Sequence, residues 1–264
     1  MLSSKLLLLL LPVSAILLKQ FLPQLLQSVC QKYRKGQEGE RVHDVSITLR
    51  PGGILFGRPQ GLDPSFRELI AEIPKGDNYY MSFLKMEAHT GTHIDSPAHF
   101  TEYHMKDKDG ITIEKIDLDV LIGPAFVLEI PAGVMNITDA VLQELHIPTN
   151  CERLLLRTDN SRNQLLQKPF TPDYSALTSD GSRYLAQKTR VKSVGIDSLS
   201  IATTTDNVGG HVELFHKDRV IIPIEGMMLE DIAPGHWYDM TCLPIKLQGA
   251  EGSPARCVLM GPTA

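Results

Sequence analysis

The sequence predicts a mixed α/β fold with a large β content, formed by a single domain. Apolar runs of strand length recur along the chain, whereas stretches with helical spacing are few and short. The chain has 264 residues, 42% of them hydrophobic and 22% charged, which is an ordinary globular composition. Because no repeat, low-complexity run or Pro-, Gly- or Ser-rich linker divides it, one domain is favoured over two.

The first half of the chain is predicted to be mainly strand and loop. Val42–Leu49 alternates weakly and is expected to be the first strand. The glycines and prolines between residues 52 and 61 predict a loop. Tyr79–Ala88 alternates and is rich in aromatics, so it is expected to be a strand that leads to a sharp turn. Ile122–Ile130 is strongly apolar and predicts a buried strand.

In the second half, strands alternate with short helices. Thr138–Leu145 is expected to be a helix with Thr138 as its N-cap. Further helices are predicted over Ser179–Lys188 and Val208–Phe215. Strands are predicted, in chain order, over Arg153–Arg157, Ser193–Ile196, Val220–Ile224, Met240–Leu247 and Arg256–Met260. The last two are expected to pair antiparallel and close the fold.

A dense group of metal-ligand residue types lies between residues 89 and 99. It consists of His89, His93, Asp95 and His99. Imidazole nitrogen and carboxylate oxygen suit zinc, manganese or iron, so a metal site is favoured over a structural cluster. A glycine and a proline inside the segment argue against a helix. In an extended chain His93 and Asp95, two residues apart, would point toward one ion.

This segment fits the pattern His-x-Gly-Thr-His-x-Asp-x-Pro-x-His at every fixed position. It resembles the cyclase family of metal-dependent hydrolases, which includes bacterial-type kynurenine formamidases and isatin hydrolase. The resemblance extends from about Val45 to the C-terminus. It implies a swivelling β/β/α architecture, a homodimer, and His89, His93 and Asp95 as metal ligands.

The resemblance also implies that His211 and Glu225 complete the ligand set. Glu225 ends a buried apolar strand, where a carboxylate is costly unless it is paired or bound to a cation. His211 lies on a predicted helix, at a spacing slightly longer than the family pattern. His216 is therefore the alternative ligand, although its charged neighbours favour a solvated residue.

The expected cofactor is a divalent ion, Zn²⁺ first and Mn²⁺ second, with one or two ions per subunit and Asp95 as a possible bridge. A bound divalent ion lowers the pKa of water from near 16 to about 7 and polarises the carbonyl that is attacked. His99 is predicted to be the general acid/base, with a fifth ligand or a hydrogen-bond partner of Asp95 as alternatives. Asp197 is expected either to support the site or to form a turn. Three further polar residues are expected at the surface or in turns: Asp231, His236 and Asp239.

The leading function is arylformamidase-like hydrolysis of N-formyl-L-kynurenine to kynurenine and formate. The alternatives are hydrolysis of a cyclic amide, imide or lactone, and a non-catalytic, metal-stabilised secreted binding protein. The candidate aromatic contacts for the substrate are Phe56, Phe100, Tyr103 and Trp237. A serine hydrolase is disfavoured because Ser96 lacks a nucleophile elbow. A nucleic-acid partner is disfavoured by the net charge of −5 and the absence of a basic patch with interleaved aromatics.

Residues 1–28 are predicted to be a signal peptide or hydrophobic leader, and residues 40–264 the hydrolase domain. Lys5 precedes an apolar run of signal-peptide length, so a secreted or secretory-pathway protein is favoured over a membrane-anchored one. Once the leader is cleaved, no stable membrane association is expected. The sequon at Asn136 fits this route. Of four cysteines, Cys242 and Cys257 could bridge adjacent strands, although small buried residues are slightly favoured.

Overall fold

Four parallel strands of apolar residues form the centre of the main sheet. The computed structural model describes residues 40–216 and 219–262. The parallel strands are β5 (Ile122–Glu129), β7 (Arg153–Arg157), β9 (Ser193–Ile196) and β12 (Ile222–Glu225). Every residue of β9 and β12 is buried, as expected for parallel strands that are covered on both faces.

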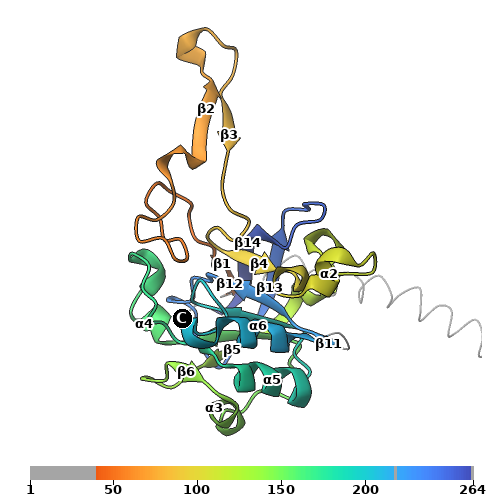
Figure 1. Ribbon diagram of the computed structural model, residues 1–264. Coiled ribbons are helices and arrows are strands. Elements are labelled where there is room, and N and C mark those ends of the chain that lie inside the picture. The colour runs from red at the N-terminus through yellow and green to blue at the C-terminus, as the bar shows by residue number, and fades with distance from the viewer. Residues whose placement is uncertain (1–39, 217–218, 263–264) are drawn as a thin grey trace, which may run out of the picture. The chain divides into compact units, whose positions relative to one another are not determined.

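The remaining strands of the main sheet close it into a barrel (Figure 1). They are β1 (Glu40–Asp44), β4 (His93–Asp95), β13 (Trp237–Pro244) and β14 (Gly252–Pro262). The strand order is β1-β14-β13-β5-β7-β9-β12-β4, and β14 pairs with β4 as well. Seven strands therefore form a closed ring, and β1 extends it at β14. The short strand β4 bonds to a neighbour on both sides and is the point of closure.

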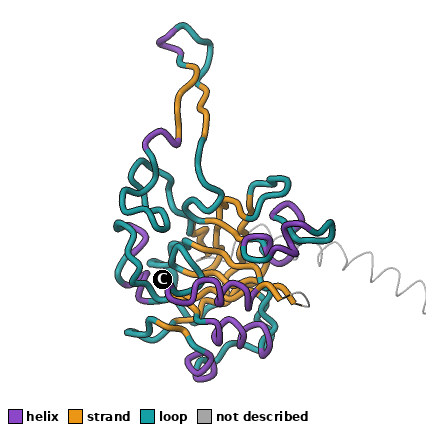
Figure 2. Tube along the Cα trace, viewed as in Figure 1, coloured by secondary structure: helices purple, strands orange, loops and turns teal. Residues whose placement is uncertain are grey.

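The barrel separates two apolar cores. One lies among barrel residues such as Ile94, Leu155 and Ile224. The other lies between the sheet and the helices, where Leu142 and Leu185 pack against strand residues. These helices are α3 (Asp139–Glu144), α5 (Ser179–Lys188) and α6 (Asn207–Leu214), and they lie together beside the sheet in Figures 1 and 2. Burial of both cores is the main favourable contribution to folding.

Shorter elements complete the described chain. The additional strand pairs are β2 (Arg67–Ala71) with β3 (Met81–Leu84), β6 (Asn136–Ile137) with β8 (Ala176–Leu177), and β10 (Phe215–His216) with β11 (Arg219–Val220). Two short α-helices are α2 (Glu102–Lys106) and α4 (Asp159–Arg162). The 3-10 helices are η1 (Pro64–Phe66), η2 (Ile73–Lys75), η3 (Pro97–His99), η4 (Ile113–Lys115), η5 (Leu118–Val120), η6 (Leu165–Gln167) and η7 (Thr204–Asp206).

The predicted fold class is confirmed, and most predicted elements in the second half lie within one or two residues of the observed ones. The Thr138 side chain caps α3 by accepting a hydrogen bond from the Val141 amide. The first half is less accurate. The predicted strand Val42–Leu49 ends at Asp44, because the chain then turns to bond with the segment after β12. The predicted strand Tyr79–Ala88 shrinks to Met81–Leu84, and all four of its residues are exposed.

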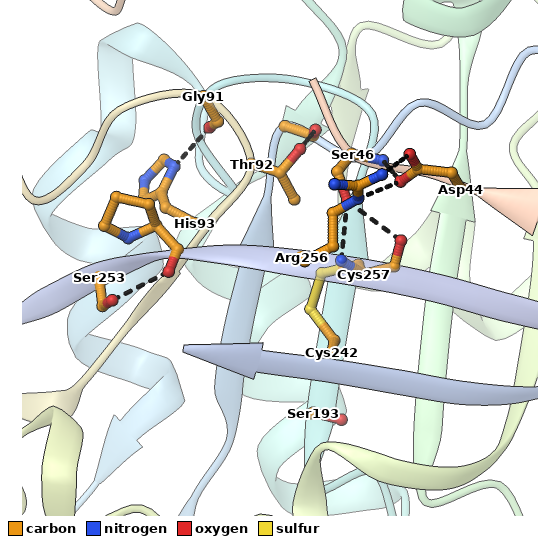
Figure 3. Close-up of a disulfide and its surroundings, with 12 residues drawn as sticks. Asp44, Ser46, Gly91, Thr92, His93, Ser193, Cys242, Ser253, Arg256 and Cys257 are labelled. Carbon is orange, nitrogen blue, oxygen red and sulfur yellow. Dashed lines mark hydrogen bonds and ion pairs between the residues drawn. A yellow bond between two sulfur atoms is a disulfide. The ribbon is translucent and has the colours of Figure 1, made fainter. Parts of the chain in front are cut away.

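Cys242 and Cys257 form a disulfide between paired residues of β13 and β14 (Figure 3). The sequence slightly favoured two small buried residues at these positions, and that preference was wrong. Spacing alone could not show that the two cysteines face each other across adjacent strands. Cys151 is buried and forms no disulfide with another described cysteine; its thiol donates a hydrogen bond to the Arg153 carbonyl at 3.1 Å. Cys30 and the predicted leader, residues 1–28, lie outside the described residues. Within the described part, none of the helices combines the length and apolar character needed to span a membrane.

Candidate metal centre

The closure of the barrel brings one imidazole and two carboxylate groups together. In β4, His93 and Asp95 lie two residues apart and point the same way, with His93 Nε2 3.5 Å from Asp95 Oδ1. On the neighbouring strand β12, Glu225 is the register partner of His93. Its Oε2 lies 3.1 Å from His93 Nε2. All three side chains are buried, so the strand pairing positions a polar cluster inside the fold.

The Gly-Thr pair of the motif shapes the turn that precedes β4. Gly91 has a φ of +69°, and a Cβ there would lie 2.5 Å from a methyl carbon of Leu49. Its carbonyl accepts a hydrogen bond from His93 Nδ1 at 2.9 Å (Figure 3). Thr92 Oγ1 donates to the Gly226 carbonyl at 2.6 Å, which ties the turn to the end of β12. Gly91 and Thr92, which lie between the two histidines of the motif, therefore fix the turn that positions His93.

His211 enters the cluster from α6. Its Nδ1 donates to the Asn207 carbonyl at 2.7 Å, and its Nε2 lies 3.2 Å from Glu225 Oε1 and 3.6 Å from Asp95 Oδ2. Since carbonyl oxygens only accept, Nδ1 of both His93 and His211 carries the proton. In the neutral tautomers, Nε2 of each ring then directs a lone pair at carboxylate oxygens. Such a set is favourable only when a cation or an additional proton lies between the groups.

His89 and His99 form the other side of the cluster. His89 Nδ1 is 2.7 Å from Asp95 Oδ1, and its ring stacks on the His99 ring with centroids 3.9 Å apart. Gly252 of β14, the register partner of Asp95, makes room for this arrangement. A Cβ at Gly252 would lie 2.5 Å from His89 Cε1.

The ligand atoms fall into two groups that share one carboxylate. His89, Asp95 and His99 form the first, and His93, Asp95 and Glu225 form the second, with the ligand atoms of each group within 4.8 Å of one another. In the described residues, His89 Nε2 and Asp95 Oδ2 are buried atoms without a hydrogen-bond partner. Unsatisfied buried polar atoms of this kind fit a bound divalent ion, and the sharing of Asp95 fits two.

The electrostatics favour positive charge in the cluster. Burial lowers the pKa of His89, but the hydrogen bond and charge of Asp95 raise it to about 9. Burial likewise lowers the pKa of His93 and His211, while hydrogen bonding to Glu225 raises both above the usual value. Burial opposes ionisation of Glu225, yet these histidines hold its pKa below the usual range. Burial lowers the pKa of His99, which keeps that ring neutral.

A cavity of about 280 Å³ opens onto the cluster. Its lining includes the imidazoles, Glu225, and the apolar side chains Phe56, Phe100 and Leu199. The Phe100 ring stacks on the His211 ring at 4.1 Å and so supports that histidine. Three larger cavities, of about 550, 500 and 360 Å³, open elsewhere on the domain, and of their lining residues only Glu87 also lines this one. The chemistry-bearing groups therefore lie in the smallest of these four, which has room for a compact substrate.

The structure brings together all six predicted site residues, which are His89, His93, Asp95, His99, His211 and Glu225. The alternative ligand His216 is exposed on β10 and lies apart from them. Of the four candidate aromatics, Phe56 and Phe100 line the cavity, whereas Tyr103 and Trp237 do not. The three residues expected at the surface, Asp231, His236 and Asp239, are exposed.

Asp197 supports the site from behind. Its buried carboxylate accepts hydrogen bonds from the Thr158 and Ser161 amides, the Thr158 hydroxyl and the Asn160 side chain. These bonds fix the start of the loop whose Ile201 amide donates to Glu225 Oε1 at 2.7 Å. Asp197 is absent from the cavity lining, so it positions the loop and not a ligand.

Several residues of the cavity were not predicted from the sequence. Glu87, Ser200 and Asn207 line it, and Glu251 Oε1 lies 3.4 Å from His89 Nε2. Asn207 precedes His211 by one helical turn, and this spacing was the signal that could have placed Asn207 near the site. Nothing in the sequence around Glu251 indicates its position, because the pairing of β14 with β4 brings it there.

A closed barrel with a buried histidine–carboxylate cluster beside an apolar cavity defines the class of metal-dependent hydrolases. The chain belongs to the Cyclase family, whose model, described as "Putative cyclase", matches residues 43–203. It is 34% identical to Cyclase-like protein 1 of Arabidopsis thaliana over 86% of this chain and 88% of that protein. It is 32% identical to the kynurenine formamidase of Bacillus cereus over 67% of this chain and 78% of that enzyme.

Solved structures agree with this family. A potential metal-dependent hydrolase with cyclase activity matches with a TM-score of 0.68 and 30% identity, covering 85% of this chain and all (100%) of that one. Isatin hydrolase A from Labrenzia aggregata matches with a TM-score of 0.67 and 20% identity, over 91% of this chain and 100% of that enzyme. The second match supports the fold alone. Together with the ligand groups, the comparisons support a hydrolase that uses a divalent metal.

Proposed function

We propose that this protein is a metal-dependent amidohydrolase of the arylformamidase type, which converts N-formyl-L-kynurenine and water to kynurenine and formate. The observation that carries the proposal is the pair of ligand groups sharing Asp95, with two unsatisfied buried atoms, beside a cavity with aromatic walls. A formamide supplies the carbonyl, and its aryl group would lie against Phe56, whose ring faces the same cavity.

The proposed ligands are His89, His93, Asp95, His211 and Glu225, and the preferred ion is Zn²⁺, with Mn²⁺ as the alternative. A divalent ion held there would lower the pKa of water and polarise the formyl carbonyl. The protein contributes the fixed orientation of the rings. The Gly91 and Asn207 carbonyls hold His93 and His211 with Nε2 inward, and the Ile201 amide holds Glu225.

His99 is the proposed general acid/base. It lies at the end of η3, faces the cavity and is neutral because burial lowers its pKa. A neutral imidazole can take the proton from the attacking water and return it to the leaving aryl nitrogen. Water adds to the formyl carbon, the C–N bond breaks, and formate and the free amine are released.

Metal content and activity test this proposal together. Elemental mass spectrometry on the purified protein should find one or two equivalents of zinc or manganese. Formate release from N-formyl-L-kynurenine should stop after chelation and return when metal is added back. Metal without formate release would contradict the arylformamidase assignment and leave the metal centre intact. A protein that takes up no metal under any condition would contradict both.

A second candidate is hydrolysis of a cyclic amide, imide or lactone. The compact cavity favours it, because a fused ring such as isatin is smaller than N-formylkynurenine. The two substrate classes are distinguished by assaying ring opening of isatin in parallel with formate release.

We further propose that the protein enters the secretory route through the leader at residues 1–28 and is released from the membrane once that leader is cleaved. The sequon residue Asn136 is exposed on β6, which leaves it accessible to a glycan. Expression in a eukaryotic secretory host should give a protein that shifts in mass on treatment with an N-glycosidase, and Asn136→Gln should abolish that shift. A full-length protein retained in the cytosol would contradict the proposal.

A further inference from the structure

Glu251 is an acidic residue beside the metal centre that is neither a proposed ligand nor part of the cavity lining. It directly precedes β14, and its Oε1 lies 3.4 Å from His89 Nε2. The Glu251 side chain is 36% exposed, whereas that of Asp95 is only 1% exposed. His89 therefore lies between two carboxylates, one at the edge of the site and one at its centre.

Backbone hydrogen bonds fix the position of Glu251 beside the ligand strand. Its carbonyl accepts hydrogen bonds from the Ser96 amide at 2.8 Å and from the Ser96 hydroxyl at 3.0 Å. Ser96 is fully buried and follows Asp95 directly in the motif. The preceding residue, Ala250, accepts a hydrogen bond from the Ile113 amide at 2.9 Å. The fold therefore holds residue 251 at the end of β4, where β14 and β4 pair (Figure 1).

The next residue, Gly252, allows the His89 ring to lie against this segment. A Cβ at Gly252 would be 2.5 Å from His89 Cε1 and 2.9 Å from Nε2, so the ring packs directly on the glycine backbone. Nε2 faces Glu251 from this edge of the ring. On the other side, Nδ1 lies 2.7 Å from Asp95 Oδ1. Each ring nitrogen of His89 therefore faces its own carboxylate.

A divalent ion bound to Asp95 would be shared with the nitrogen of His89 that faces this carboxylate. That nitrogen is Nδ1, and the two residues belong to one ligand group. When Nδ1 of a neutral imidazole binds an ion, Nε2 carries the proton and becomes a donor. In the described residues, His89 Nε2 is a buried atom with no hydrogen-bond partner. An ion at Nδ1 would therefore give Nε2 a proton that Glu251 can accept in a hydrogen bond.

We propose that Glu251 is a positioning residue for His89, which accepts a hydrogen bond from Nε2 and so directs Nδ1 to the metal. A shift of a few tenths of an ångström in either side chain shortens their separation to a hydrogen bond. A carboxylate on the second nitrogen of a histidine ligand fixes the ring and raises its basicity. This inference rests on the metal centre of the proposed function and not on the identity of the substrate.

His89 would then differ from the other two histidine ligands. His93 and His211 donate from Nδ1 to backbone carbonyls and would bind through Nε2. His89 would bind through Nδ1, and its proton acceptor is a charged side chain. A backbone carbonyl is fixed by the fold, whereas a carboxylate can be removed by substitution. The role of Glu251 can therefore be tested without changing a ligand.

Zinc titration of the apo protein measures this role. Glu251→Ala should weaken zinc binding by ~10–100-fold, as the loss of a residue hydrogen-bonded to a ligand does. Glu251→Gln should lose much less, because its amide oxygen still accepts a hydrogen bond. Glu144→Ala is the matched control, since Glu144 is exposed at the end of α3. Thermal unfolding of each apo protein shows that the variants are folded.

A double substitution shows whether Glu251 acts through His89. In a His89→Ala background, Glu251→Ala should change zinc affinity by no more than about 2-fold, because no ring remains to be positioned. The remaining zinc is held by the group of His93, Asp95 and Glu225. An equal loss in both backgrounds would mean that Glu251 acts on the metal by another route and would overturn the inference.

Proton–nitrogen correlation spectra of the isotope-labelled, zinc-loaded protein show which ring nitrogen carries the proton. His89 should be protonated at Nε2, and His93 and His211 at Nδ1, with His89→Ala identifying the His89 signals. A proton on Nδ1 of His89, or equal zinc affinity of Glu251→Ala and the wild type, would overturn this inference and leave the proposed function standing. A wild type that takes up no zinc or manganese would overturn both.

Discussion

The hairpin of β2 and β3, residues 67–85, which we call the arm, is followed closely in the chain by the candidate metal centre. The two regions reverse the usual distribution of apolar and polar side chains in opposite ways. In the arm, apolar side chains such as Tyr80 and Phe83 are exposed. A few residues later, His93 and Asp95 are polar and are each only 1% exposed. The arm therefore exposes apolar side chains that proteins normally bury, and the candidate metal centre buries polar side chains that proteins normally expose.

The difference indicates what each region lacks. A buried polar cluster with unsatisfied atoms requires a ligand of opposite charge, which the Asp95 cluster would find in a divalent cation. An exposed apolar hairpin requires another apolar surface to cover it. Experiments that change one region and measure both can show whether the two requirements are independent.

The largest effect is expected from Asp95→Asn. This change removes the carboxylate that both ligand groups share, so metal should be lost and turnover should fall below detection. The effect should exceed the ~10–100-fold loss of metal affinity or activity that follows when a residue hydrogen-bonded to a ligand is removed. Elemental analysis and the formate assay measure the two effects. Asp239→Asn, an exposed carboxylate on β13, should change neither. Full activity of Asp95→Asn would rule out the shared site.

His99→Ala should reduce turnover by roughly 10²–10⁴-fold while the metal content stays unchanged, because a general acid/base acts on the substrate without holding the ion. Metal content and kcat, measured on the same preparation, separate the two roles. If one metal equivalent is lost together with activity, His99 is a ligand in the group formed with His89 and Asp95.

Gly252→Ala should weaken metal binding by ~10–100-fold, since the added Cβ would lie 2.5 Å from His89 Cε1 and displace that ring. Titration of the apo protein with zinc measures the change. Gly133→Ala is the control, because nothing lies within 4 Å of its Cβ position; its φ of +83°, which Gly252 does not share, adds backbone strain but no contact with a ligand. Equal metal affinity in the two variants would mean that His89 is dispensable.

The smallest effect on catalysis is expected from Phe83→Asp. Because Phe83 is exposed and does not line the site cavity, turnover should stay within about 3-fold of the wild type, as for a surface substitution remote from the site. The formate assay and elemental analysis are run on the same preparation. A much larger loss with unchanged metal content would show that the two regions are coupled.

Local patterns predicted the second half of the chain well, because its elements are short and clearly apolar. The residues of β7, β9 and α5 were predicted with their observed bounds. The strand predicted over Tyr79–Ala88 was too long. Alternation predicts a strand but not which face is buried, and β3 has no buried face. Cys242 and Cys257 were left open because disulfide formation depends on the register of two strands.

The sequence by itself determined which residues are the candidate metal ligands, since dense histidine and carboxylate spacing is rare and the turn between His89 and Asp95 is encoded locally. Only the tertiary structure decided that Asp95 is shared between two groups and that Glu225 faces His93. It also exposed the arm and brought Glu251 near His89. The positions of Glu225 and Glu251 depend on strand pairing between residues more than a hundred positions apart, and no local pattern in a single sequence records such pairing.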